Sequence, residues 1–264
     1  MKKYYEPERA KMETGLEPVP EEVRAAYLRP GELLSIQETF PVAFQPIGTL
    51  EWHGRQNPIG CDAIKAEMLC IETAKITGGA VMPTIYFSTD AYRDTGCGVG
   101  LGMDPVAGFQ LPGSFYKIEN ETLKSLVKQA CINYLSRGFK LVVLVSGHNP
   151  FIQENLLNEL CYELKTDEGK EPVFFTMEYQ VLEPDNPRRH SDHAGHYETS
   201  MMLYLNPSRV NISANDNKER PNLAVDTRRP VVESTAEEGE ICFIMQVEGL
   251  AKKVKGKLEN LAVL

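Results

Sequence analysis

Hydrophobic runs bounded by glycine and proline alternate with amphipathic segments from about residue 40 onward. A short, unbroken apolar run is typical of a strand that is buried on both faces of a parallel sheet. Apolar residues that recur three and four positions apart are typical of a helix. The predicted strands are 41–48, 80–87, 140–146 and 173–177. The predicted helices are 63–77, 120–138, 150–164, 197–205 and 240–259.

This alternation predicts an α/β fold with three layers, in which helices cover both faces of a mostly parallel central sheet. Residues 1–40 lack a sustained apolar period until Leu33, so we expect an N-terminal extension with one short helix at 20–28. Residues 41–264 are then a single domain, which is long enough to bury a core. Ligands of such sheets bind beyond the carboxyl ends of the strands. The segments that follow strands, and so share one crevice, are 48–62, 146–150 and 178–198.

Composition narrows the classes of protein. Hydrophobic residues make up 42% and charged residues 25% of the 264, as in a soluble globular domain. No apolar run approaches the roughly 18 residues of a membrane span, and the N-terminus shows no apolar stretch of a secretory signal. The net charge of −9 argues against a nucleic-acid partner. The six cysteines form no Cys-x-x-Cys pair, which indicates reduced thiols and a cytoplasmic protein rather than a zinc ribbon.

Histidines and carboxylates gather in the three predicted crevice segments. Glu51 and His53 are two residues apart, so in an extended segment their side chains point to the same side. Asp62 begins a predicted helix and His148 follows a buried strand. The third segment contains Asp192, His193, His196 and Glu198. Such a mixture of oxygen and nitrogen donors suits zinc, manganese or iron(II), and one carboxylate can bridge two ions.

Other readings of these residues stay open at this point. Asp62 could simply cap its helix, and His148 could be a hydrogen-bonded core histidine. Cys61 beside Asp62 is a possible nucleophile, although nothing in the sequence indicates a lowered pKa of its thiol. His190 is interpreted as a loop residue next to two arginines. The glycine-rich run at 96–102 lacks a strand before it and a helix after it, so we do not interpret it as a phosphate loop.

Three motifs together resemble those of the creatininase family. PIGTLEWHGRQNPIGCD at 46–62 resembles its Pro-x-Gly-x-x-Glu-x-His-Gly signature and the aspartate that follows. GFKLVVLVSGHNP at 138–150 is similar to its buried strand followed by Gly-His. HAGHYETS at 193–200 resembles its His-Ala-Gly-x-x-Glu-Thr-Ser motif. The resemblance extends over about residues 40–260, and the combination is far more specific than any single motif.

The resemblance implies the creatininase fold and a metal-dependent amidohydrolase. Such an enzyme would cleave a C–N bond of a small cyclic amide or formamide-type substrate with metal-activated water, using one or two divalent ions. Zinc is the first expectation, with manganese or iron as alternatives. The implied metal ligands are Glu51, His53, Asp62 as a bridge, His148 and Glu198. The implied catalytic residues are His193 as proton shuttle, Asp192 as the residue that orients it, and Glu198.

Departures from the family pattern define the open questions. Creatininase itself has a glutamate that holds its second metal at the position of Pro150, so Glu198 or His196 would have to replace it, or a single metal would bind. Trp52 is the only tryptophan, which argues against creatinine as the substrate. The alternative is a non-catalytic or substrate-binding member with a degenerate second metal site. The family resemblance also implies a homo-oligomer, a hexamer. Residues 1–40 fall outside the resemblance, and we expect them to pack on the surface of the domain or on a neighbouring subunit.

Overall fold

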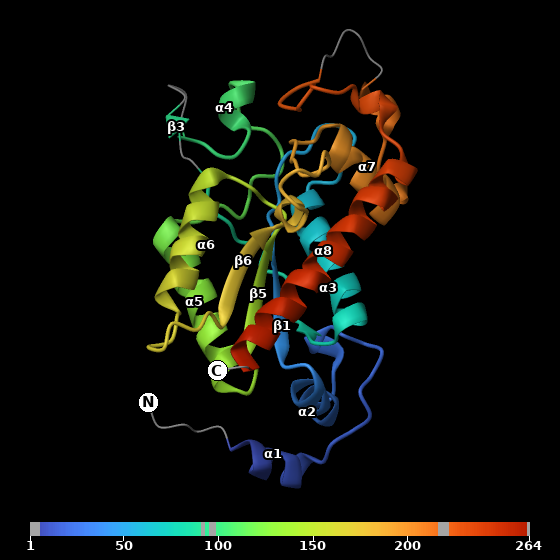
Figure 1. Ribbon diagram of the computed structural model, residues 1–264. Coiled ribbons are helices and arrows are strands. Elements are labelled where there is room, and N and C mark those ends of the chain that lie inside the picture. Colours follow the sequence, from blue (N-terminus) through green and yellow to red (C-terminus); the bar gives the residue numbers. More distant parts are fainter. Residues whose placement is uncertain (1–5, 91–92, 95–98, 216–221, 263–264) are drawn as a thin grey trace.

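A parallel sheet lies at the centre of the protein in the computed structural model, which describes residues 6–90, 93–94, 99–215 and 222–262. Its strand order is β2, β1, β5, β6, and neighbouring strands all run parallel (Figure 1). These strands are Ala80–Val81, Val42–Ile47, Leu141–Ser146 and Val173–Met177, respectively. β1 and β5 pair along their whole length, from Val42 opposite Leu141 to Ile47 opposite Ser146. Every residue of β1 and β5 is buried, so both central strands are covered on their two faces.

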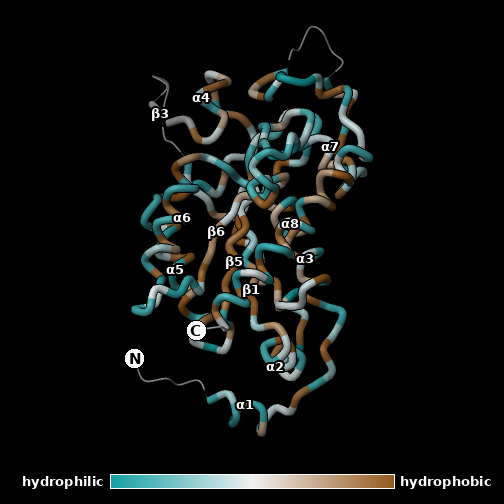
Figure 2. The backbone as a smooth tube through the Cα atoms, viewed as in Figure 1, coloured by the Kyte–Doolittle hydropathy of each residue, from teal (hydrophilic) through white to brown (hydrophobic). Residues whose placement is uncertain are grey.

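Helices cover each face of the sheet and complete the three predicted layers (Figure 1). One face carries α3 (Cys61–Thr77), α7 (His196–Leu205) and α8 (Ala236–Ala262), and the other carries α5 (Asn120–Ser136) and α6 (Phe151–Glu163). Side chains of the strands alternate between two hydrophobic cores, because successive residues point to opposite faces. Phe44 and Val143 pack in the core beneath α3 and α8, whereas Ala43 and Leu144 pack in the core beneath α5 and α6. Figure 2 shows the hydrophobic residues concentrated along these strands. The predicted fold class is confirmed.

Two predicted elements differ from the structure. The strand expected at 80–87 is reduced to Ala80–Val81, because Pro83 has no N–H to donate and interrupts the ladder, which resumes only as an isolated bridge between Ile85 and Ile47. The helix expected at 20–28 is reduced to the 3-10 turn η1 at Ala25–Tyr27. Helices α1 (Pro7–Thr14) and α2 (Pro30–Thr39) flank that turn instead, each with proline in its first turn, where no N–H is needed.

The remaining elements lie mainly in the loops at the carboxyl ends of the strands. β3 (Arg93–Asp94) and β4 (Val99–Gly100) form a small antiparallel ribbon, followed by α4 (Asp104–Ala107). Residues 96–98 of the glycine-rich run lie outside the described residues. The other 3-10 turns are η2 (Glu178–Val181), η3 (Pro207–Arg209), η4 (Ile212–Asn215) and η5 (Val231–Glu233). Among the helices of the described ranges, none is both long and apolar enough to cross a lipid bilayer.

The N-terminal segment is partly joined to the domain. Leu34 and Ile36 of α2 are buried, and Ile36 belongs to the core beneath α5 and α6. By contrast, α1 has no buried residue. The division of the chain at residue 40 stays a prediction.

Two glycines at strand ends fix where α3 begins. Gly48 follows β1 and Gly147 follows β5. A Cβ atom on Gly147 would come closer than 3.0 Å to the carbonyl oxygen of Asp62, and one on Gly48 would come equally close to the backbone of Ala63. The first turn of α3 therefore rests directly on the ends of both central strands. This close approach places Asp62 between the loops that leave β1 and β5.

Candidate metal centre

A cavity of about 310 Å³ opens at the carboxyl ends of the strands, where the sequence predicts the site. Six of the seven predicted site residues line it: Glu51, Asp62, His148, Asp192, His193 and Glu198. The seventh, His53, lies behind this lining with 0% of its surface exposed. The structure thus brings side chains from three separate loops, which leave β1, β5 and β6, to one cavity.

Asp62 joins two groups of possible metal ligands. We call Glu51 Oε2, Asp62 Oδ2 and His148 Nδ1 the first ligand group. His148 Nδ1 lies 3.1 Å from each of its two carboxylate oxygens. We call His53 Nε2, Asp62 Oδ1 and Glu198 Oε2 the second ligand group. His53 Nε2 lies 3.0 Å from Asp62 Oδ1 and 3.5 Å from Glu198 Oε2. The helix-capping reading of Asp62 is not supported, because α3 has no side-chain cap and both oxygens of Asp62 face histidines.

The donor set fits a divalent ion. Zinc lies about 2.0–2.2 Å from nitrogen and carboxylate ligands, so its ligands lie roughly 3.0–3.5 Å from one another. The nitrogen–oxygen distances of 3.1 Å in the first ligand group, and of 3.0 and 3.5 Å in the second, match that spacing. One possible ligand atom each of Glu51, Asp90 and His148, and of His53, His193 and Glu198, also lie within 4.8 Å of one another. In addition, His53 Nδ1 lies 3.1 Å from the carbonyl oxygen of Glu51 and can donate to it. In that tautomer, His53 Nε2 turns its lone pair toward an oxygen of Asp62, an arrangement that a cation or a proton between the two atoms stabilises.

The charges of the cluster support one another. Burial opposes ionisation of Asp62, but His53 and His148 hold the pKa of this carboxyl well below its usual value. Burial also opposes ionisation of Glu51, whose pKa is nevertheless lowered by His148 and Lys117. Burial disfavours the charged form of His53, yet Asp62 and Glu198 raise its pKa to about 9. Both carboxylates are therefore ionised at neutral pH, the form that binds a metal.

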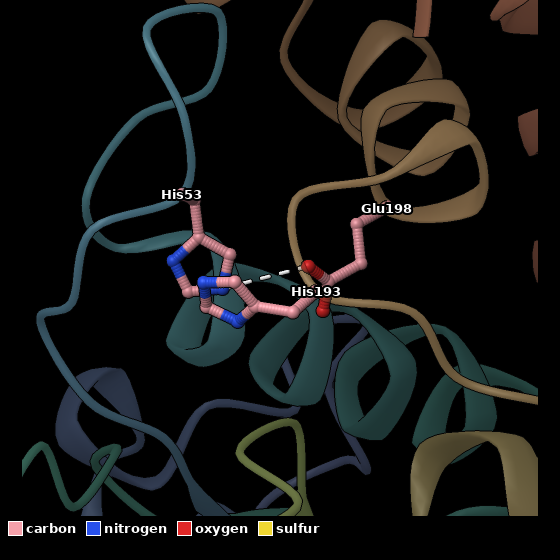
Figure 3. Close-up of side chains that lie close together, drawn as sticks. All are labelled: His53, His193 and Glu198. Atoms are coloured by element: carbon pink, nitrogen blue, oxygen red, sulfur yellow. Dashed lines mark ion pairs between the residues drawn. The ribbon is translucent and has the colours of Figure 1, made fainter. Parts of the chain in front are cut away.

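His193 lies against the second ligand group (Figure 3). Its ring centroid is 4.6 Å from that of His53, and its Nε2 lies 2.7 Å from the carbonyl oxygen of Trp52. Burial lowers the pKa of His193, and the neighbouring His53 lowers it further. With a proton on Nε2 donated to Trp52, the Nδ1 atom of the neutral ring is free to accept a proton. The next residue, Ala194, has a left-handed backbone (φ 52°), an uncommon conformation for a residue other than glycine.

Asp192 accepts hydrogen bonds from the first turn of α7, the helix that carries Glu198. Its two carboxylate oxygens accept hydrogen bonds from the backbone N–H groups of Tyr197 (2.8 Å) and Glu198 (3.1 Å), in the first turn of α7. Burial, and next to it the charge of Glu198, raises the pKa of Asp192 to about 6. Among the described residues, the carboxylate's hydrogen bonds come from this helix and not from His193, so Asp192 positions Glu198 directly.

Three further residues that the sequence singled out lie elsewhere. His196 is buried with its Nε2 atom 2.8 Å from Glu238 Oε2, so it contacts α8 rather than either ligand group. His190 packs edge-on against Tyr197, with ring centroids 3.8 Å apart. Burial raises the pKa of Cys61 well above its usual value, which keeps the group a thiol and removes it as a nucleophile.

Two buried lysines were missing from the sequence-based site. Lys65, with 3% of its surface exposed, hydrogen-bonds Glu198 Oε1 and lies 3.1 Å from Glu178 Oε1. Lys117 Nζ lies 2.9 Å from His148 Nε2 and 3.4 Å from Glu51 Oε2. Lys65 and its partner Glu178 did have a signal in the sequence. Lys65 is three residues after Asp62, which puts both on one face of the helix, and Glu178 directly follows a predicted strand. Lys117 lies in a long loop without periodicity, so no pattern indicated it.

The fold and the cavity define an α/β/α protein with a candidate divalent-metal centre at the carboxyl ends of its strands. The family described as creatininase, creatinine amidohydrolase, matches residues 27–254. The chain therefore belongs to the creatininase family, as its motifs predicted.

Individual relatives agree with this assignment. The chain is 27% identical to the creatinine amidohydrolase of Pseudomonas putida over 188 residues, which are 65% of this chain and 66% of that protein. A crystal structure of creatinine amidohydrolase superposes with a TM-score of 0.69 at 18% identity, covering 90% of this chain and 98% of the other. A manganese creatininase superposes with a TM-score of 0.67 at 19% identity, covering 89% and 98%. At these identities the two structures establish the fold alone.

Proposed function

We propose that this protein is a metal-dependent hydrolase that cleaves a C–N bond outside peptides, in a small cyclic amide or formamide-type compound. The observation that carries the proposal is the position of Asp62. Its two oxygens face imidazole nitrogens of His53 and His148, at 3.0 Å and 3.1 Å, inside a buried cluster. Family membership supports an amidohydrolase, and its relatives include creatininases with zinc and with manganese.

The residues proposed to hold the metal are Glu51, His53, Asp62, His148 and Glu198. A divalent ion, when bound among them, lowers the pKa of water toward about 7 and polarises a carbonyl group. Zinc is the first candidate because the donors are imidazoles and carboxylates, and manganese and iron(II) accept the same donors. Asp62 offers one oxygen to each ligand group and is the proposed bridge between them.

His193 is the proposed proton shuttle. Its lowered pKa leaves the ring neutral at pH 7, so Nδ1 can take a proton from the attacking water and deliver it to the leaving nitrogen. The carboxylates of Glu51 and Glu198 face the imidazolium that forms in this step and stabilise its charge. Asp192 takes part indirectly, because it holds the first turn of α7 and thereby the side chain of Glu198.

The cavity supports a small substrate. Its volume of about 310 Å³ suits a molecule of a few heavy atoms beside a metal ion rather than a peptide. Trp52, the only tryptophan of the chain, is not among the residues that line the cavity, and its indole N–H donates to the carbonyl oxygen of Leu223. A substrate that needs an indole to stack on it is therefore not favoured.

Metal analysis tests the proposal most directly. Purified protein is expected to retain a divalent metal, and His53→Ala and Asp62→Ala are expected to lose most of it. His193→Asn is expected to keep its metal while hydrolysis of cyclic amides and formamides falls by roughly 10²–10⁴-fold. His190→Asn is the control, because His190 contacts Tyr197 outside the ligand groups. Full metal retention in both alanine variants would refute the assignment of the site.

We also propose that the chain forms a homo-oligomer, as the family resemblance implies. The N-terminal segment leaves large apolar side chains exposed, among them Met12, Val19 and Tyr27. Such side chains are better covered in a subunit contact than in water. Removal of residues 1–38 should lower the number of subunits per particle, obtained by light scattering from the particle mass and the mass of the truncated chain, and an unchanged number of subunits would contradict this role of the segment.

A further inference from the structure

Lys65 lies inside a cluster of carboxylates. Its ammonium group hydrogen-bonds Glu198 Oε1, lies 3.1 Å from Glu178 Oε1 and lies 3.7 Å from Asp62 Oδ1. Only 3% of the Lys65 surface is exposed, and Glu178 is held from its other side by Asn149, whose amide nitrogen lies 2.9 Å from Glu178 Oε2. The positive charge is therefore fixed in place by the first turns of α3 and α7 and by the end of β6.

This ammonium group shares its partners with the second ligand group. Both carboxylates of that group, Asp62 and Glu198, form ion pairs with Lys65. A divalent ion bound there would share the oxygens of Asp62 and Glu198 with a buried ammonium group. Two neighbouring positive charges repel each other strongly where water is excluded. The negative charge of Asp62 and Glu198 is partly neutralised by Lys65, so these carboxylates attract a second cation less strongly. The ammonium group of Lys65 thus supplies the positive charge that a second metal ion would bring.

In the first ligand group a lysine pairs with one of the two carboxylates, whereas in the second group Lys65 pairs with both. Lys117 Nζ lies 3.4 Å from Glu51 Oε2 and 2.9 Å from His148 Nε2, and its ion pairs among the described residues do not include Asp62. Lys117 is shared with Asp90, 3.3 Å away. The His148 Nδ1 atom remains 3.1 Å from both Glu51 Oε2 and Asp62 Oδ2. The first group therefore keeps three ligand atoms, and fewer than four protein ligands leave an open position for a reacting molecule.

We propose that Lys65 stands in place of a second divalent cation, so that the protein binds one ion tightly at the first ligand group and a second only weakly. This inference rests on the proposed function, since it concerns the same metal centre. From the Coulomb repulsion between a dication and an ammonium in a partly desolvated site, the second ion should bind at least ~100-fold more weakly than the first.

Titration of metal-free protein with Mn²⁺, followed by calorimetry, measures both dissociation constants. Lys65→Met should strengthen binding of the second ion at least ~10-fold, because the repelling charge is gone. The conservative variant Lys65→Arg keeps the charge and should bind like the wild type. Lys117→Met is the matched control, because this second buried lysine borders the first ligand group instead. By the same repulsion argument it should strengthen binding of the first ion and leave binding of the second ion unchanged.

Electron paramagnetic resonance of the wild type gives a readout that needs no variant. One equivalent of Mn²⁺ should give the spectrum of an isolated ion, and a second equivalent should add mainly the signal of free Mn²⁺. A spin-coupled spectrum at two equivalents would mean two tightly bound ions and would overturn this inference while the proposed hydrolase stands. Unchanged weak binding of the second ion in folded Lys65→Met would overturn it as well. Failure of the wild type to bind any Mn²⁺, Zn²⁺ or Fe²⁺ would overturn the proposed function together with it.

Discussion

Gly147 is expected to control the metal centre although it carries no side chain. It lies where β5 ends, and a Cβ atom there would approach the carbonyl oxygen of Asp62 to less than 3.0 Å. Its nearest neighbours are all backbone or Cα atoms of Asp62, which cannot turn away as a flexible side chain can. In Gly147→Ala, the first turn of α3 must therefore move away from the end of β5. Asp62 then moves with the helix.

The magnitude follows from the kind of contact. Overpacking a well-packed interior costs about 1–3 kcal/mol, and a clash with backbone belongs at the upper end of that range. For a protein of this size, about 3 kcal/mol corresponds to a decrease of roughly 6–12 °C in the melting temperature. The same movement increases the distance between Asp62 and His148, which are both ligands in the first ligand group. We expect the affinity for a divalent ion to fall at least ~10-fold, since ligand positions must match the ion within a few tenths of an ångström.

Calorimetry and metal titration of the same preparation check both expectations. Gly256→Ala is the control, because Gly256 lies in α8 and a Cβ atom there meets no heavy atom within 4 Å. That variant should be as stable as the wild type or more stable by about 0.5–1 kcal/mol, since alanine is the better helix former. If Gly147→Ala melts within 1 °C or so of the wild type and binds metal equally well, the close packing of α3 on β5 does not position Asp62.

Three further outcomes are expected. The pKa of His53 is raised from 6.5 to about 9 in the fold, so the stability from its charged form is complete below pH 6.5 and disappears as the pH rises through 9. Denaturant unfolding of metal-free protein should show this as a loss of about 3 kcal/mol between pH 6 and pH 10 that is absent in His53→Gln. Native Cys61, whose thiol pKa is raised by burial, should stay unlabelled by iodoacetamide at pH 8 in peptide mapping, and rapid labelling would contradict its burial. His196→Gln should keep its full metal content by elemental analysis, because His196 pairs with Glu238 instead of a ligand group, and loss of metal would contradict that placement.

Strand ends made much of the site predictable from sequence. Unbroken apolar runs identified β1, β5 and β6, and parallel strands bring the loops at their carboxyl ends to one edge of the sheet. Glu51 and His148 follow two of these runs closely, so their meeting in one cavity required no knowledge of side-chain packing. The hydrophobic run at 80–87 predicts a longer strand than the observed β2, because the run does not reveal that Pro83 interrupts the hydrogen-bonded ladder.

The partners of the candidate ligands were less accessible to such reasoning. Asp192 and His193 are adjacent in the chain, yet the carboxylate turns to the N–H groups of α7 and the ring turns to Trp52. The left-handed backbone of Ala194 lies between His193 and α7, and alanine carries no signal for that conformation. Lys117 reaches the site from a loop without hydrophobic periodicity. Contacts that depend on loop conformation leave no periodic pattern of hydrophobic residues, so the sequence does not predict them.

The two lysines explain how so many carboxylates can share one buried site. Glu51, Asp62, Glu178 and Glu198 are all buried, and unpaired charges of this kind are too costly to keep in a protein interior. Lys65 offsets the carboxylates near α7, and the histidines and Lys117 offset those near β5. The positive charge that remains to be supplied is concentrated around Asp62 and the two imidazoles that face it. A fold that brings its own cations to one part of an acidic cluster thereby selects where a divalent ion binds and how many it needs.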